Sequence, residues 1–419
     1  MYPELLNRTL RLIDEHHKFS SECICLVASE NASSPLARIA LSSDLIQRYT
    51  YHGHYKAYEE LEKIVEKAFI KLLGAERCCL NPVSGTTANI AAYMLLSDYN
   101  AKYMALDPEH GGHKSFMEDN AAGILRMKRY SIPFIGRDMR IDVDKTIKLI
   151  REIEPTLIIL GATVILFPQP VKEIVEVARE VNAKVMFDAA HVFGLIIGGK
   201  FPNPIKDGVD VMTASTHKTF PGPQGGIIFY SLKYEEKLKK IVNTLFSNLH
   251  PNKLPSLAIT LAEMITYGND YARQIIVNAK TLAERLNELG VPVLCEHLGF
   301  TETHQVVIDA SKFGGGLKAL EMLRSSGILC TAVKIPIDHG KNSISGLRLG
   351  TAEVTRLGMK EDEMRIIAEL IAQSLFKRKS FSEVKFKVRE LKHNFNKVHY
   401  CFDSKINAYE NFIKFIMRF

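Results

Sequence analysis

The sequence predicts an α/β protein with a large, mostly parallel sheet followed by a smaller α+β unit. Up to about residue 255, short apolar runs alternate with longer amphipathic helical patterns. Beyond that point a long helical stretch leads into a second group of strands and helices. The 419 residues also exceed the usual size of one domain, about 100–200 residues. We therefore expect an N-terminal arm over 1–30, a large domain over 31–265 and a small C-terminal domain over 266–419.

The arm and the large domain contain the elements that define the fold. Residues 3–18 place apolar side chains at helical spacing, and residues 55–73 do the same. A break at 81–87 precedes another helix, which runs to about residue 96. The expected strands are 103–106, 157–160, 185–187, 211–214 and 226–230, with helices at 145–154 and 171–182. Strands separated by helices favour a parallel sheet with helices on both faces.

The second unit begins with the long helical stretch at 257–289. Apolar runs around Val293 and Val306 predict strands, and a further strand is expected at 328–333. The expected helices of this unit are 315–326, 361–377 and 382–393. Strands and helices mixed in this order are typical of a small α+β domain.

Composition excludes several classes of protein. The chain is 46% hydrophobic and 24% charged, which is typical of a folded globular protein and excludes disordered and fibrous ones. Its 54 basic and 47 acidic residues give a net charge of +7, too weak a bias to predict nucleic-acid binding. The seven cysteines form neither an even disulfide framework nor a zinc motif, so no metal is expected. No leader or membrane-spanning run is apparent, so we expect a cytoplasmic protein without a membrane partner.

A lysine lies at an unusual position, in the connection between the expected strands 211–214 and 226–230. The segment reads Ser215-Thr216-His217-Lys218-Thr219. A lysine that forms an imine with a carbonyl cofactor needs a fixed position and a lowered pKa, which hydroxyl neighbours and desolvation provide. The alternative is a surface turn with an incidental lysine.

Two further segments fit the same chemistry. Asp188 follows the apolar strand 185–187, at the strand end where open α/β sheets bind ligands. A carboxylate there can pair with a protonated pyridine nitrogen, although a helix N-cap is the alternative. Ser84, Gly85 and Thr86 begin a helix, where free N–H groups and the helix dipole form an anion site. Such helix starts also occur as simple caps.

The remaining segments supply a histidine and an arginine. His110 and His113 could together bind a metal ion, but a role in stacking on the ring of a cofactor suits His113 better. Arg348 lies between Gly346 and Gly350. Its guanidinium could bind a carboxylate through two hydrogen bonds, and the alternative is a surface arginine on a strand. The combination of these motifs is a far more specific signal than any one of them. It comprises a phosphate cradle, a stacking ring, a strand-end aspartate, an imine lysine and a carboxylate-binding arginine.

With these motifs the chain resembles the serine hydroxymethyltransferase family of fold-type I pyridoxal phosphate enzymes, especially its archaeal branch. The resemblance runs from Leu26-Val27-Ala28-Ser29-Glu30-Asn31 to Arg348-Leu349-Gly350-Thr351. It implies an aspartate aminotransferase-like fold, with a seven-stranded, mostly parallel sheet in the large domain. It also implies a homodimer with shared active sites, a small amino-acid substrate, pyridoxal 5'-phosphate, and a reduced pterin (tetrahydrofolate or tetrahydromethanopterin) as co-substrate.

The resemblance implies roles for individual residues. Lys218 is implied as the Schiff-base lysine, with His217 as its phosphate-side neighbour and Asp188 on the pyridine nitrogen. His113 would stack on the ring, and Thr163 would lie near its phenolic oxygen. His191 would contact that phenolic oxygen or the substrate. The phosphate would be held by Ser84, Gly85 and Thr86. The substrate carboxylate would be bound by Arg348 and Ser29. The residues implied in catalysis are Lys218, His113, His191 and His52.

The chain departs from the family after Arg48-Tyr49, where a loop carrying a catalytic Glu is missing and His52 replaces a Tyr. Lys114 and Pro108 stand where leucines of the pterin pocket are expected. We expect cleavage and formation of the Cα–Cβ bond of β-hydroxy amino acids, interconverting serine and glycine with a reduced pterin. Two alternatives remain open: a pterin-independent, threonine-type aldolase or transaldolase, and a catalytically degenerate protein that binds pyridoxal phosphate.

Overall fold

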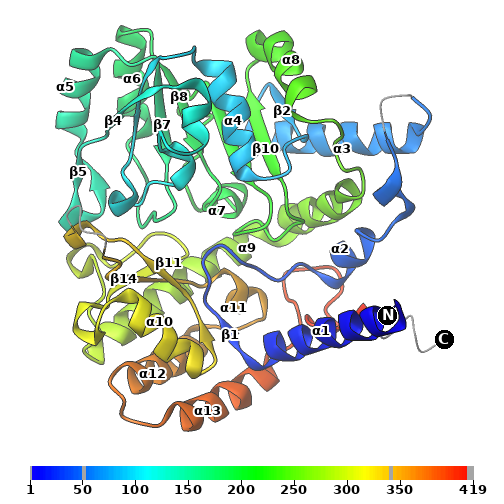
Figure 1. The fold of residues 1–419 in the computed structure, drawn as a ribbon, viewed down its shortest axis with the longest axis vertical. Coiled ribbons are helices and arrows are strands. Elements are labelled where there is room, and N and C mark those ends of the chain that lie inside the picture. The colour runs from blue at the N-terminus through cyan, green and yellow to red at the C-terminus, as the bar shows by residue number, and fades with distance from the viewer. Residues whose placement is uncertain (1, 50–52, 339–342, 413–419) are drawn as a thin grey trace.

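The computed structural model describes residues 2–49, 53–338 and 343–412. A sheet with its helices occupies the upper half of the molecule, and a smaller unit lies below it (Figure 1). The N-terminal helix α1 (Tyr2–Glu22) belongs to the lower half, where it packs against α13 (Phe381–Asn394).

The large sheet has seven strands in the order β2-β10-β9-β8-β7-β3-β4. Their bounds are β2 (Arg77–Cys79), β10 (Gly226–Tyr230), β9 (Val211–Ser215), β8 (Lys184–Asp188), β7 (Leu157–Gly161), β3 (Lys102–Ala105) and β4 (Lys128–Ser131). Pairing is parallel from β9 to β4, and β10 lies antiparallel between β9 and β2. The predicted mostly parallel, seven-stranded sheet is therefore confirmed, with all five expected strands in it.

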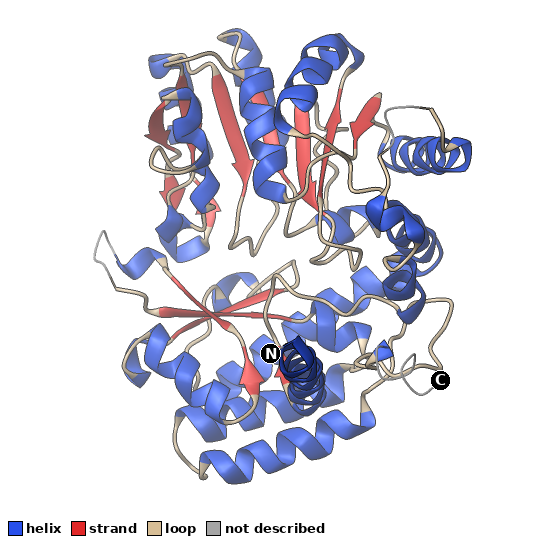
Figure 2. Cartoon of the chain, turned by 45° about the vertical axis from the view of Figure 1, so that its right-hand side comes forward, coloured by secondary structure: helices blue, strands red, loops and turns tan. Residues whose placement is uncertain are grey.

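Helices cover both faces of this sheet (Figure 2). Successive residues of β7 point to opposite cores: Ile158 and Leu160 to one, Leu157 and Ile159 to the other. The first core takes residues from α3 (Lys56–Leu73), α5 (Val143–Ile153), α6 (Val171–Glu180), α7 (Phe193–Ile197) and α9 (Lys253–Glu288). The second core takes residues from α4 (Gly85–Leu96) and α8 (Glu235–Leu245). Burial on both faces explains why the parallel strands read as continuous apolar runs.

The smaller unit is built on a three-stranded antiparallel sheet in the order β11-β14-β13. These strands are β11 (Gln305–Asp309), β14 (Gly346–Gly350) and β13 (Thr331–Val333). Its helices are α10 (Gly316–Ser325), α11 (Ala352–Arg356), α12 (Glu361–Leu375) and α13. The expected strand 328–333 is divided, because β12 (Ile328–Leu329) leaves the sheet to pair with β1 (Ile24–Cys25). The expected strand around Val293 is wrong: Val293 forms a single bridge to Ile308.

A short helix and a hairpin complete the α-helices and strands of the described residues. The helix α2 (Pro35–Ala40) follows the arm, with Ser34 as its N-cap. A hairpin of β5 (Phe134–Ile135) and β6 (Arg140–Ile141) extends the large unit.

Helix α9 connects the two units, and at 36 residues it is the longest helix of the described chain. Its residues through Ile275 pack in a large-sheet core, and those from Ala279 pack in the core of the small unit. A boundary at 265–266 would fall inside this helix, and the predicted domain limits remain a prediction. None of the helices in the described ranges, α9 included, is long and apolar enough to cross a membrane.

A fully buried ion pair fixes α11 against α9. Arg356 Nη2 donates to Glu263 Oε2 at 2.6 Å, and neither side chain is exposed to solvent. Removing one partner of such a pair leaves an unpaired buried charge, which costs about 3–5 kcal/mol. Loss of either partner is therefore expected to loosen the contact between α11 and α9.

Candidate active site

The carboxyl ends of the parallel strands surround one cavity of about 160 Å³. It is lined by Ser84, Gly85, Thr86, Asn89, His113, Ala162, Thr163, Asp188, Ala190, His191, Ser215, His217 and Lys218. Every residue that the sequence predicts for the cofactor is in this set. Residues spread over more than 130 positions of the chain are thus brought to one place.

Strand order explains how these side chains meet. Asp188 ends β8, and β9 beside it ends at Ser215, just before His217 and Lys218. Thr163 follows the end of β7, the neighbour of β8 on its other side. Adjacent parallel strands present their carboxyl ends at the same edge of the sheet, so residues distant in sequence converge there.

The start of α4, where an anion site is predicted, forms part of the cavity wall. Ser84 is its N-cap: the Ser84 Oγ accepts from the Thr87 amide at 3.1 Å, and the Thr87 Oγ1 accepts from the Ser84 amide at 3.0 Å. Ser84 is therefore a helix cap, and anion binding at the same helix start stays a prediction. A Cβ on Gly85 would lie 2.5 Å from the Ser215 Oγ, so a side chain there would close the space in front of the helix. The first amides of α4 remain available to an anion.

Asp188 also lines the cavity and lies in a network of buried hydrogen bonds. Its Oδ2 accepts from the Asn89 Nδ2 at 2.8 Å, and its Oδ1 accepts from the Ala190 amide at 2.9 Å. Asn89 Nδ2 also donates to the Ser115 Oγ at 3.1 Å. The Ser115 amide in turn donates to His113 Nδ1 at 3.1 Å. The network holds the carboxylate and the predicted stacking ring in fixed positions.

Lys218 has the lowered basicity that its predicted role requires. Burial lowers the pKa of its amine to about 8, with Asp188 opposing and Arg348 assisting this change. The backbone oxygen of Lys218 accepts from the Asn31 Nδ2 at 2.6 Å, which fixes the turn that carries it. An amine with this pKa is in part unprotonated near neutral pH, and in that form it is a nucleophile.

The histidines of the cavity are neutral at physiological pH. Burial lowers the pKa of His113, and it lowers that of His217 to about 4. The pKa of His191 lies well below its usual value because of burial and because Lys218 and Arg348 lie nearby. Asp188 thus faces the cavity together with neutral rings and the cationic Lys218.

Two polar atoms of lining residues have no hydrogen-bond partner within the described protein. They are the Thr163 Oγ1 and the His217 Nδ1, and both are buried. Buried polar groups are almost always paired in folded proteins. Together with the helix start and the fixed carboxylate, they suit a ligand with a phosphate, a basic ring nitrogen and a carbonyl group, the groups that pyridoxal phosphate carries.

Arg348 lies behind this cavity on β14 of the small unit. It is 3% exposed, and its Nη1 donates to the backbone oxygen of Thr163 at 2.6 Å. Its Nε has no partner among the residues that the structure describes. Burial lowers its pKa to about 10, so the guanidinium stays cationic at neutral pH. An arginine with a spare Nε donor beside Thr163 can bind a carboxylate next to the cavity.

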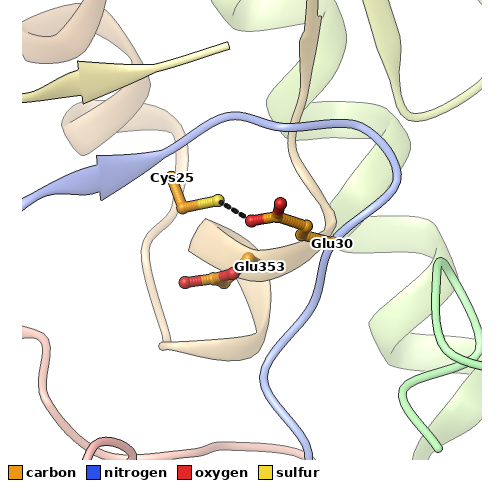
Figure 3. A group of neighbouring side chains, drawn as sticks. All are labelled: Cys25, Glu30 and Glu353. Atoms are coloured by element: carbon orange, nitrogen blue, oxygen red, sulfur yellow. Dashed lines mark hydrogen bonds between the residues drawn. The ribbon is translucent and has the colours of Figure 1, made fainter. Parts of the chain in front are cut away.

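Ser29 lines a second cavity of about 660 Å³, and His217 is common to both cavities. Beside Ser29 lies a group made of Cys25, Glu30 and Glu353 (Figure 3). The Cys25 Sγ donates to the Glu30 Oε2 at 3.4 Å. Burial and both carboxylates raise the thiol pKa well above its usual value, so Cys25 remains a protonated donor. The predicted carboxylate-binding role of Ser29 stays a prediction.

Sequence reasoning missed several residues of the site, and one predicted residue is not among those that the structure describes. His52 falls outside the described residues. Asn89 carries a weak signal, because it lies one helical turn beyond Gly85 and so on the same side of α4. His304 and Gln305 lie in the small unit, and no motif connects them with the cavity; the packing of the two units brings them to His191.

Comparisons with known proteins agree with this geometry. A family model described as serine hydroxymethyltransferase matches residues 7–371. The chain is 43% identical to a serine hydroxymethyltransferase of Methanopyrus kandleri, over 97% of each chain. It is 42% identical to that of Pyrococcus furiosus, over 96% of this chain and 98% of the relative. A crystal structure of an L-threonine transaldolase from Pseudomonas fluorescens superposes with a TM-score of 0.87 at 29% identity, covering 100% of this chain and 98% of that one. The chain therefore belongs to the serine hydroxymethyltransferase family.

Proposed function

We propose that this protein is a pyridoxal phosphate-dependent hydroxymethyltransferase that interconverts serine and glycine with a reduced pterin as one-carbon carrier. One observation carries the proposal: Lys218 with its lowered pKa, the fixed Asp188 carboxylate and the open helix start at Ser84 line the same small cavity. Membership of the serine hydroxymethyltransferase family gives this arrangement its reaction.

The described residues fit pyridoxal phosphate in one orientation. The amides at the start of α4 would hold the phosphate, with Ser84, Gly85 and Thr86 around it. Asp188 would hold the ring nitrogen, and His113 would lie against the ring. Thr163 and His191 would meet the remaining ring oxygen, and Lys218 would hold the aldehyde carbon. When bound, the cofactor supplies an electron sink for the electron pair of a breaking bond at Cα.

Each protein group has a distinct part in the reaction. Asn89 and the Ala190 amide hold the Asp188 carboxylate, which would keep the ring nitrogen of the bound cofactor protonated. Arg348 binds the substrate carboxylate and so orients the Cα–Cβ bond. Lys218, with a pKa of about 8, exchanges protons readily near neutral pH, which suits proton transfer at Cα.

A second candidate function is transaldol chemistry. The L-threonine transaldolase from Pseudomonas fluorescens matches the full length of this chain. In this alternative the protein would cleave a β-hydroxy amino acid and pass the glycyl unit to another aldehyde without a pterin. Cα–Cβ cleavage by Lys218, Asp188 and Arg348 is common to both functions, so the acceptor distinguishes them.

The deciding experiment measures glycine formation from serine by the cofactor-loaded protein, with and without a reduced pterin. Tetrahydrofolate and tetrahydromethanopterin are tested separately, and a third arm supplies an aldehyde with no pterin. We expect a rate that depends strongly on one of the two pterins. An unchanged rate without pterin, together with stimulation by the aldehyde, would establish transaldolase activity instead. Absence of turnover in all three arms would indicate a degenerate, cofactor-binding protein.

We further propose that two copies form a homodimer with shared active sites, in part through α1. Leu5, Leu12 and Phe19 of this helix are 66%, 52% and 49% exposed. Their seven-residue spacing places them on one face of the helix. Apolar faces of this kind on a folded protein mark interaction sites.

Light scattering tests the dimer directly. We expect the mass of two chains for the wild-type protein and of one chain after the double substitution Leu12→Asp and Phe19→Asp. The matched control is Phe386→Asp, which changes an equally apolar side chain, 63% exposed, on α13. A wild-type mass of one chain would refute the dimer.

We also propose a cytoplasmic location. All seven cysteines are free thiols, and six of them are buried. Proteins of oxidising compartments tend to form disulfides, whereas cytoplasmic proteins keep their thiols reduced. Free thiols throughout the chain support a reducing compartment.

A further inference from the structure

Gln305 is a fully buried side chain that connects the small unit to the active-site cavity. It is the first residue of β11, and it reaches three groups of the large unit. Its Oε1 accepts from the Ile165 amide at 3.0 Å, and its Nε2 donates to the Thr163 backbone oxygen at 3.0 Å. The same Nε2 lies 3.1 Å from His191 Nδ1.

The two backbone contacts determine the orientation of the Gln305 amide. A backbone N–H can only donate and a backbone oxygen can only accept, so the Ile165 amide identifies Oε1 and the Thr163 oxygen identifies Nε2. Flipping the amide would set two donors against each other and two acceptors against each other. The nitrogen that faces His191 is therefore an NH2 group, with one hydrogen used by Thr163 and the other directed at His191 Nδ1.

His304 does not compete for that hydrogen. Its Nε2 lies 3.4 Å from the Gln305 Nε2, but it is also 3.1 Å from the Ala28 backbone oxygen, to which it must donate. Two N–H groups cannot bond to each other, so His304 serves as a neighbour that packs rather than as an acceptor. Its ring stacks on His191 with the centroids 5.6 Å apart and the planes 18° from parallel.

We propose that Gln305 is a positioning residue that keeps His191 in the tautomer protonated on Nε2. Because His191 Nδ1 accepts from Gln305, a neutral ring must carry its proton on Nε2. His191 lines the cavity, and Nε2 is the nitrogen left for it. The cavity thus receives a hydrogen-bond donor, which selects an oxygen acceptor on the ligand: the ring oxygen of the cofactor or an oxygen of the amino acid.

The identity of the ligand in this inference rests on the proposed function. The tautomer of His191 does not depend on it. Burial and the neighbouring cations Lys218 and Arg348 keep the His191 ring neutral, as the fixed-tautomer argument requires. The groups that face this ring are Gln305, His304, Lys218, Arg348 and His113. None of these five groups is an acid. The Asp188 carboxylate, which also lines the cavity, accepts from Asn89 and from the Ala190 amide.

The test is NMR of the full-length protein labelled with ¹⁵N in histidine, with and without pyridoxal phosphate. His191→Asn identifies the His191 signals by their loss. We expect the wild-type ring to be protonated on Nε2 alone and not to titrate around neutral pH. Gln305→Glu keeps the Oε1 acceptor for Ile165 but replaces the donor by a carboxylate. In this variant we expect Nδ1 to be protonated and the ring to become cationic near neutral pH.

The matched control is Gln169→Glu, which adds the same charge at a glutamine that accepts from the Gly161 amide through Oε1. It should leave the His191 signals unchanged. The wild-type spectrum alone decides the case if Gln305→Glu fails to fold. A proton on Nδ1 of wild-type His191, or no change of tautomer in a folded Gln305→Glu, would overturn the inference. Failure of pyridoxal phosphate to bind would refute the proposed function but not this inference, because the tautomer of His191 is measured in the ligand-free protein as well.

Discussion

Replacing Lys218 with alanine is expected to lower serine turnover by about 10²–10⁴-fold or more, with the fold retained. The expected loss is large because, in the proposed reaction, this one side chain both holds the cofactor and moves the proton at Cα. Lys218→Arg should be nearly as inactive, since a guanidinium stays protonated and is not a nucleophile. Initial rates and thermal melting of the purified variants check this. Turnover by Lys218→Ala within tenfold of wild type would contradict the assigned role.

The pH dependence of cofactor attachment is a second, independent test of Lys218. A lysine with a pKa near 8 has about two orders of magnitude more free amine at neutral pH than one at the usual value of 10.5. The free amine increases as pH rises, so the rate of cofactor attachment to the ligand-free protein should rise with pH and level off above about pH 8. A rate that keeps rising toward pH 10 would show an ordinary lysine.

Replacing Arg348 with lysine is expected to raise the KM for serine about a hundredfold or more. A carboxylate held by a guanidinium fork makes two charge-assisted hydrogen bonds, each contributing about 1.5–3 kcal/mol. A lysine keeps the charge but loses the fork, and it also loses the contact with the Thr163 backbone oxygen. Because Arg348 does not line the cofactor cavity, the affinity for pyridoxal phosphate should change much less.

Arg140→Lys serves as the matched control for Arg348→Lys. Arg140 lies over the Phe167 ring at the surface, 43% exposed, and its substitution should leave the KM for serine unchanged. Serine KM and cofactor Kd are measured for both variants. An unchanged KM in Arg348→Lys, or a cofactor Kd that rises as much as the KM, would contradict carboxylate binding by Arg348.

The parts of the site that the sequence predicts lie next to secondary-structure ends. Asp188 and Lys218 follow apolar strands, and Ser84 begins a helix, so local patterns alone place them at one sheet edge. The strands missed by the sequence are short or polar. β4, for example, is an edge strand of Lys128–Ser131 with no apolar run, and pairing with β3 rather than hydrophobic pattern defines it.

Residues that reach the site through long-range packing could not be predicted. Gln305 begins β11 in the small unit and His304 directly precedes it. Their relation to His191 depends on how the two units meet. Ser29 illustrates the limit of local sequence motifs. Its motif is local, but the fold of the arm places this residue in the larger neighbouring cavity. Local sequence patterns therefore predict the functional groups at strand ends. The contacts between the two units depend on the tertiary fold and cannot be predicted from those patterns.

One measurement tests the central claim, that pyridoxal phosphate binds in this cavity on Lys218. The cofactor-loaded protein is reduced with borohydride, digested, and its peptides are mapped by mass spectrometry. The protein contains its own control in Lys253, which is also buried with a pKa lowered to about 8 but donates to the Leu80 and Pro82 backbone oxygens. The cofactor mass should appear on the Lys218 peptide. Its appearance on Lys253 or any other lysine, or on none, would contradict the assignment of the site.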